Sequence, residues 1–546
     1  MSKFWRNYST TIHKQKNSLR KVSILINESI YDFINKGSTS EIIQNNPLKD
    51  NIKVKINKSC NFGYKLVNGK CRPDFFIKII YLIKQKEQKI ELIKDYSDIL
   101  HIYIESKKIK PSSTKYLFKE EGYHIVSIQF KESLYYKSKL FENNKYIISV
   151  TFSDFDEYMI DLPLNSIFAG CTNLTSVDFS NISYIYESNM EHMFDGCINL
   201  NYVNLNNLQV KNSVAYMFRN CHSFTSINLS KFNVKKVIYL NNMFENCFSL
   251  QNINIKGFEI NNALTMESIF KNCYSLKYID LSDFKPYKLN NIHSSFYNCT
   301  SLTNINFIKF NTSELNDMGY LFYNCSSLKN LDLTYFDTKK VKYMKSSFEG
   351  CINLNTIKAS SNFKFDNVEK INSMFKDCHS LSFINFDIKI TNKVPVLSSL
   401  FSNCYSLTSI NMKYFDTSNV YNYSYMFHNC YNIKYIDISN FIIKRKADLK
   451  GMFSGCYKIA SINFSNVKND YYKIDKIFYD CPNLNYVNIS FLRAFPYIYS
   501  YRANNLLFNK NISGNGTLIL NEKYYQTYIK KIGSYPSSGW NLILTN

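Results

Sequence analysis

The stretch FYNCSSLKNLDLTYFDT, residues 322–338, contains the pattern that decides the fold of this chain of 546 residues. It has a phenylalanine three residues before Cys325 and apolar residues at +3, +6 and +8, counted from that cysteine. The same arrangement recurs thirteen times, with 24 to 27 residues between successive cysteines. A fixed period of this length predicts a solenoid, in which each unit stacks on the next.

The cysteines and the phenylalanines before them form a predicted structural ladder. Its members are Phe168, Cys171, Phe194, Cys197, Phe218, Cys221, Phe244, Cys247, Phe270, Cys273, Phe296, Cys299, Phe322, Cys325, Phe348, Cys351, Phe375, Cys378, Phe401, Cys404, Phe427, Cys430, Phe453, Cys456, Phe478 and Cys481. No C-x2-C pair of the kind that zinc sites use occurs, so we interpret the cysteines as buried thiols that fill a corner of each unit. Disulfides and metal binding are the minor alternatives.

The residues on the two sides of each cysteine have different periods. Leu315, Met318, Leu321 and Phe322 follow the spacing of one face of a short helix. The residue directly before each cysteine is Gly, Asn or Asp, types that end helices in a left-handed conformation. After the cysteine the apolar residues alternate, which predicts a strand. One unit is therefore a short helix, a capped turn, a strand and a second turn.

Two segments show a family resemblance, LKNLDLTYFDT at residues 328–338 and YMFHNC at residues 425–430. They resemble the leucine-rich repeats of the BspA type, a variant of about 25 residues found in bacterial and protist surface proteins. The resemblance covers about residues 114–546. It implies an α/β solenoid, with parallel strands on one face and short helices on the other.

The chain is predicted to contain five regions. These are a basic, partly disordered arm (1–58), a cysteine-containing hairpin that resembles an EGF-like fragment (59–73), a small antiparallel β domain (74–113), a leucine-rich repeat solenoid of about 14 or 15 units (114–500), and a C-terminal cap of strand, helix and strand (501–546). Two units at the start of the solenoid are degenerate, with Asn144 and Gly122 in place of the cysteine. Terminal repeats are often atypical because they cover the exposed end of the core.

The compartment is left open by the sequence. No signal peptide and no transmembrane helix are recognisable, which favours an intracellular protein, whereas the resemblance implies a surface or secreted one. Cys60 and Cys71 lie outside the ladder, and a disulfide between them would indicate an oxidising compartment.

Motifs of catalysis and cofactor binding are not recognisable. The sequence has no glycine-rich phosphate loop, no H-E-x-x-H and no G-x-S-x-G. His222 and His379 directly follow ladder cysteines, but adjacent residues seldom point at each other. We expect no enzyme, no catalytic residue, no cofactor and no metal site.

The +5 and +7 positions alternate with buried positions of the predicted strand and so form its open face. The candidate partner-binding face consists of Tyr202, Asn204, Asn228, Asn254, Tyr278, Asp280, Asn306, Asp332, Asn411, Tyr435, Asp437, Asn463, Tyr486 and Asn488. Tyrosine, asparagine and serine suit protein recognition, so we predict a protein partner, such as a host or cell-surface component. The alternative is structural: stacked asparagine amides could bond to one another along the column.

A formal net charge of +23, from 66 Lys and Arg against 43 Asp and Glu, supports a second hypothesis. In it the chain binds polyanions, either glycan or nucleic acid, through the basic arm. The arm holds eleven Lys and Arg against four Asp and Glu. The oligomeric state is left open.

Overall fold

The structure is a computed structural model of the chain. It describes residues 64–67, 70–73, 76–97, 99–110, 113–130, 139–152, 164–180, 185–206, 208–444, 446–464, 473–490, 515–525 and 540–545. Every described residue belongs to the unit Cys60–Asn546. The predictions for the basic arm and for Cys60 therefore lie outside the described residues.

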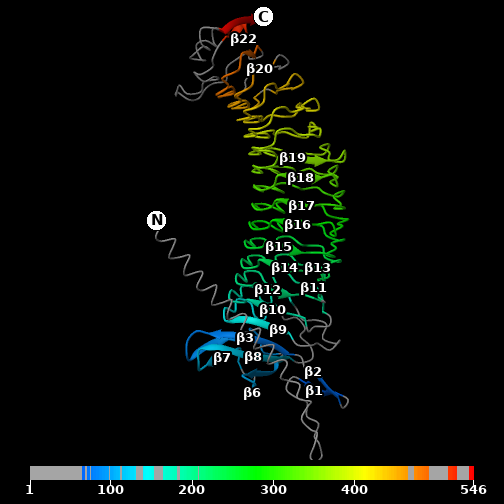
Figure 1. The fold of residues 1–546 in the computed structure, drawn as a ribbon, viewed down its shortest axis with the longest axis vertical. Coiled ribbons are helices and arrows are strands. Elements are labelled where there is room, and N and C mark those ends of the chain that lie inside the picture. Colours follow the sequence, from blue (N-terminus) through cyan, green and yellow to red (C-terminus); the bar gives the residue numbers. More distant parts are fainter. Residues whose placement is uncertain are drawn as a thin grey trace, which may run out of the picture. The chain divides into compact units, whose positions relative to one another are not determined.

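Short parallel strands, present in most coils, form the repeating element (Figure 1). They are β9 (Ile147–Phe152), β10 (Ser176–Asp178), β12 (Tyr202–Asn204), β14 (Ser226–Asn228), β15 (Asn252–Asn254), β16 (Tyr278–Asp280), β17 (Asn304–Asn306), β18 (Asn330–Leu333), β19 (Thr356–Ala359), β20 (Ser461–Asn463) and β21 (Tyr486–Asn488). Partners in neighbouring strands are one repeat apart, as Tyr278 and Asn304 are. The predicted solenoid with stacked parallel strands is confirmed.

A second ladder runs along the position eight residues before each cysteine (−8). Single bridges join Tyr239, Thr265, Asn291, Asp317, Tyr343 and Lys370 in succession. Closer to the start of the solenoid, β11 (Ile185–Asn189) and β13 (Leu208–Ser213) pair in parallel. Many coils are therefore joined to their neighbours by two ladders of backbone bridges.

The predicted short helices are wrong. In the segment that ends at Cys325, Tyr320 and Asn324 have φ of 53° and 56°, in the left-handed region that a right-handed helix does not use. The equivalent positions, −5 and −1, have positive φ in every coil from Ser166 to Asp480. Within the described residues the one helical element is the 3-10 turn η1 (Glu522–Tyr524).

Hydrogen bonding explains why a chain of tight turns replaces the helix. The N–H groups of Tyr320, Phe322 and Asn324 donate to carbonyl oxygens of the next coil, over 2.7–2.8 Å. The N–H groups between them donate to the oxygen three residues back, as Cys325 does to Phe322 over 3.1 Å. An α-helix needs every N–H for bonds within itself. Because alternate N–H groups bond to the neighbouring coil, the segment cannot be helical.

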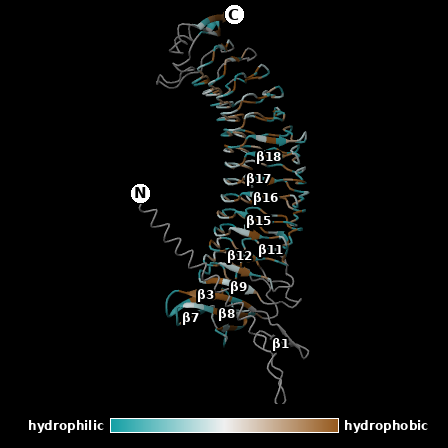
Figure 2. Cartoon of the chain, viewed as in Figure 1, coloured by the Kyte–Doolittle hydropathy of each residue, from teal (hydrophilic) through white to brown (hydrophobic). Residues whose placement is uncertain are grey.

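The interior is nevertheless the one that the apolar spacing predicted. Rings of the ladder phenylalanines stack from Phe141 to Phe478, with centroids 5.4–6.2 Å apart. The ladder cysteines lie beside them and are fully buried. Figure 2 shows apolar residues recurring from coil to coil. Burial of this continuous apolar column is the main term that holds the coils together.

An antiparallel sheet adjoins the first coils. It contains β3 (Phe76–Ile83), β5 (Ile99–Ile104), β6 (Lys107–Ile109) and β8 (Gly122–Phe130). The sheet order is β12-β10-β9-β3-β8-β5-β6, and β3 runs antiparallel to both β9 and β8. The sheet therefore continues without interruption into the solenoid. Two further antiparallel pairs are β4 (Gln88–Glu91) with β7 (Lys115–Phe118), and β1 (Tyr64–Val67) with β2 (Lys70–Pro73).

Of the two degenerate units predicted at the start of the solenoid, one is a coil and the other is not. The unit of Asn144 is a coil, because its strand β9 pairs in parallel with β10 and Phe141 stacks on Phe168 at 5.6 Å. The weaker unit around Gly122 is not a coil. Its strand β8 lies between β3 and β5 and is antiparallel to both. The +3, +6 and +8 alternation occurs in any strand with one buried face, so it did not distinguish the two directions.

The other end of the described chain is a parallel sheet. Its order is β20-β21-β22-β23, with β22 (Gly516–Asn521) and β23 (Trp540–Thr545) where the sequence predicted the two strands of a cap. The residues of the helix predicted between them lie outside the described ones, apart from Tyr525.

Candidate functional site

The open strand face is built by simple alternation along each short strand. In β16, Tyr278 and Asp280 point outward while Ile279, between them, is buried in the core. We call the +5 and +7 residues of the thirteen cysteine-containing coils the strand strip. Ten of its predicted partner-binding residues are exposed: Tyr202, Asn228, Asn254, Tyr278, Asp280, Asp332, Asn411, Tyr435, Asp437 and Asn463. Asn204, Asn306 and Tyr486 are partly buried, and Asn488 is buried.

The asparagine and aspartate side chains at +7 have a local structural role. In ten coils the side-chain oxygen accepts a hydrogen bond from the N–H two residues later, over 2.8–3.2 Å. Asp280 and Ser282 are one such pair. This is an Asx turn, which ends the strand and starts the following loop. The preference for Asn and Asp at +7 is thereby explained.

A ladder of stacked amides exists, but it lies at the −1 position and not in the strand-face column, where it was the structural alternative. At −1, directly before the cysteines, each Asn Nδ2 donates to the Oδ1 of the preceding coil, over 2.7–2.9 Å from Asn220 to Asn324. Asp377, Asn403 and Asn429 continue it in later coils. Sequence reasoning used these residues only as helix ends. The repeated Asn at one position of consecutive units was the signal for the ladder.

The aromatic rings of the strand strip have free faces. Tyr202, Tyr278 and Tyr435 lie several coils apart, and none has another aromatic ring against it in the described part of the chain. Tyr278 is 47% exposed and Tyr435 is 63% exposed. The rings at +1 contrast with them, because Tyr405 and Tyr431 stack on each other at 4.7 Å. The strip therefore has exposed ring faces that the stacked +1 column does not have.

The strand strip carries little charge of either sign. Its charged residues are Asp178, Asp280, Asp332, Lys358 and Asp437. Lys358 pairs with Asp332 at 3.2 Å. Hydrogen bonds from Ser439 lower the pKa of Asp437, so its carboxylate stays ionised at neutral pH. Partial burial, and then the charge of Asp280, raise the pKa of Tyr278, so its phenol stays neutral.

The thirteen ladder cysteines are free thiols. Each Sγ donates to the carbonyl oxygen of the ladder phenylalanine one coil earlier, as Cys325 does to Phe296 over 3.1 Å. Asn144, which replaces the cysteine, donates its side-chain N–H to the backbone carbonyl oxygen of Glu91 over 2.8 Å. Burial raises the pKa of Cys351 to about 12. These are inert structural thiols.

The two histidines that follow ladder cysteines stack on aromatic rings of the next coil. His222 lies 4.5 Å from Phe248 and His379 lies 4.3 Å from Tyr405, measured between ring centroids. Their position is therefore that of a stacked side chain. The described residues include no group of three or more His, Cys, Asp or Glu placed to hold a metal ion.

Stacked coils, most of them with one short parallel strand, and a shared apolar interior define a leucine-rich repeat solenoid of the BspA type. The model for the BspA type leucine rich repeat region matches residues 449–536. The chain belongs to the family described as "Mycoplasma protein of unknown function, DUF285", whose model matches residues 162–284, 290–390 and 384–490, together more than half of the chain. Leucine-rich repeat folds are generally interaction scaffolds.

Solved structures with a distant likeness are also leucine-rich repeat proteins. A structure of the Toll–Spatzle complex of Drosophila is 14% identical, with a TM-score of 0.24 over 67% of this chain and 40% of that chain. A leucine-rich repeat protein of Leptospira interrogans is 13% identical, with a TM-score of 0.21 over 68% of this chain and 84% of that chain. Likenesses at these TM-scores carry no argument about function. A search of curated proteins finds none that matches.

No helix among the described residues has both the length and the apolar character needed to span a lipid bilayer.

Proposed function

We propose that the chain is a binding protein, not an enzyme, and that the strand strip takes a protein partner. The observation that carries the proposal is the set of exposed tyrosines with free ring faces, flanked by Asn, Asp and Ser groups. Tyrosine buries a large area at a small entropic penalty, and the short polar residues adapt their hydrogen bonds to the partner. An adhesion-type role at a cell surface fits this mixture.

Electrostatics support a protein partner over a polyanion for this surface. The strip has four carboxylates and one lysine, although the whole chain has a net charge of +23. A polyanion would meet net negative charge along the strip and would be repelled. Polyanion binding through the basic arm is a separate proposal, which concerns residues outside the described ones.

The test is a pull-down with the immobilised full chain and a cell-surface protein extract. A variant with Tyr278, Asp280, Asp332 and Tyr435 changed to Ala should lose the proteins that the unchanged chain retains. A matched control changes Tyr239 and Tyr421 to Ala; both are exposed but lie at −8 and −9, outside the strip. Equal retention by the strip variant would exclude the strand strip as the binding surface.

A further inference from the structure

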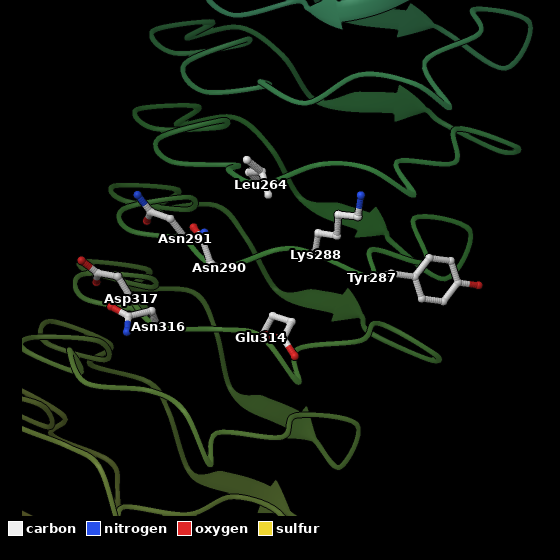
Figure 3. Close-up of a pocket in the computed structure, with 8 residues that line it drawn as sticks. All are labelled: Leu264, Tyr287, Lys288, Asn290, Asn291, Glu314, Asn316 and Asp317. Atoms are coloured by element: carbon white, nitrogen blue, oxygen red, sulfur yellow. The ribbon is translucent and has the colours of Figure 1, made fainter.

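A groove opens between two coils on a different surface from the strand strip (Figure 3). Its volume is about 790 Å³. It is lined by Leu264, Tyr287, Lys288, Asn290, Asn291, Glu314, Asn316 and Asp317. In Figure 3, Asn290, Asn291, Asn316 and Asp317 lie on one side of the groove, and Lys288 and Tyr287 lie on the other. Nothing in the proposed protein-binding role uses this surface.

The groove has a local cause in the sequence. At +13, buried threonine hydroxyls bridge to the next coil: Thr312 donates to the carbonyl of Asp337 over 2.9 Å and accepts its N–H over 2.7 Å. Thr338 makes the same bridge to Lys364. The equivalent residue of the preceding coil is Pro286, which has no hydroxyl and no N–H. The coils are therefore not bridged there, directly beside Tyr287 and Lys288.

Some polar groups of the lining already have hydrogen-bond or ion-pair partners, and others have none in the described part of the chain. Asp317 accepts from Gly319 N over 2.8 Å and lies 3.2 Å from the His293 ring. Both oxygens of Glu314 bind Lys340 over 2.7 Å. Asn291 bonds to Glu267 and to the backbone of His293.

Asn290 and Asn316 make no such bonds. They occupy the same position in successive coils, −9, and their amides have no side-chain hydrogen bond within the described part of the chain. Lys288 forms no ion pair there either. Tyr287 is 59% exposed. Two amides, one ammonium and one phenol are thus available to a ligand.

These free groups select a ligand class. Leu264 and the Tyr287 ring are the only apolar surfaces of the lining, too few for a wholly apolar ligand. A phosphate would meet two carboxylates against one free cation. Amides both donate and accept, so a pair of them matches hydroxyl groups, which also do both. An exposed tyrosine ring provides a flat apolar surface for the C–H face of a sugar ring. We propose that the groove of Asn290 and Asn316 binds a neutral saccharide.

The proposal is tested with the full chain and three probes: glucose, galactose and N-acetylglucosamine. Saturation-transfer NMR and titration should show saturable, millimolar binding of at least one of them. Changing both Asn290 and Asn316 to Ala should weaken that binding by at least about tenfold, the equivalent of one or two lost hydrogen bonds. Asn362→Ala, an exposed asparagine outside both the groove and the strand strip, is the matched control and should bind as the unchanged chain does.

A second variant separates loss of the site from loss of folding. Pro286→Thr introduces the bridging hydroxyl that Thr312 and Thr338 provide, so it should close the groove without lowering the melting temperature. Saccharide binding should then be lost while the protein stays folded. Absence of saturable binding to all three probes would overturn the proposal, as would binding that survives both the double alanine variant and Pro286→Thr. The pull-down on the strand strip is unaffected by either result.

Discussion

Asparagine makes two different kinds of hydrogen bond in this chain, and the backbone decides which. At +7 the residue is in an extended strand, where its oxygen reaches the N–H two residues later and ends the strand, as in Asn228. At −1 the residue has positive φ, which directs the amide along the stack of coils, as in Asn272. After glycine, Asn is among the residues that best tolerate the left-handed conformation. The amino-acid type is the same, but the function of the side chain is not.

Two substitutions at Asn272 separate the amide ladder from the backbone conformation. Asn272→Gly removes both ladder bonds, to Asn246 and from Asn298, but keeps φ of 61° accessible. Asn272→Ala removes the same bonds and adds about 1–2 kcal/mol of left-handed strain. We expect the alanine variant to be the less stable of the two in urea unfolding followed by circular dichroism. Equal stability of the two variants would show that the −1 conformation is not under strain.

In the turn segment before each cysteine, the apolar residues have the spacing of a helix but the backbone does not have its geometry. Leu315, Met318 and Leu321 are buried, as an amphipathic helix would bury them. The backbone between them nevertheless forms tight turns, because alternate N–H groups bond to the next coil.

The buried thiols at the ends of these turn segments share one environment. Their pKa is raised by burial in every coil, to about 12 at Cys171 and Cys481.

The raised thiol pKa values predict alkaline unfolding. A thiol that stays protonated in the folded chain loses its proton in the unfolded chain near pH 9, so the unfolded state is favoured as pH rises above that value. At one pH unit above the unfolded pKa, each thiol lowers the free energy of unfolding by about 1.4 kcal/mol. Stability should therefore be intact below pH 8 and fall steeply toward pH 10, as measured by urea unfolding at each pH.

A cysteine variant assigns this effect to the ladder. Changing Cys325 and Cys378 to Ala should reduce the loss of stability between pH 8 and pH 10 by about 3 kcal/mol. Because the comparison uses the difference in stability between pH 8 and pH 10, the lower stability of the variant at neutral pH does not affect the result. A loss as large as that of the unchanged chain would mean that other groups, such as the buried Tyr81, cause the alkaline sensitivity.

At the scale of the whole molecule, each coil is held by its two neighbours. Ladder rings, thiols, amides and the two strand ladders all join residues about one repeat apart, as Phe296 and Phe322 are. Inter-coil ion pairs follow the same rule, as in Lys340 with Glu314. Stability in such a chain is a sum over coils and the contacts between neighbours.

Deletion of one complete coil tests this arrangement. Removing residues 300–325 joins Cys299 to Ser326 and leaves every later residue at its position in the repeat. We expect that variant to fold with the circular dichroism of the full chain and a slightly lower unfolding midpoint. Removing residues 300–312, half a coil, should prevent the neighbouring coils from stacking and lower the midpoint much more. Similar behaviour of the two deletions would contradict coil-by-coil stacking.

The sequence by itself determined those features of the fold that depend only on the residue type at equivalent positions of the repeat. The period, the buried Phe and Cys ladder and the outward columns at +5 and +7 all follow from apolar spacing, because one buried face imposes one pattern. Only the tertiary structure decided how the backbone hydrogen bonds are shared. The turns in place of helices, the antiparallel direction of β8 and the unbridged groove at Pro286 depend on partners from another strand or coil. The spacing of residues within one unit contains no information about those partners.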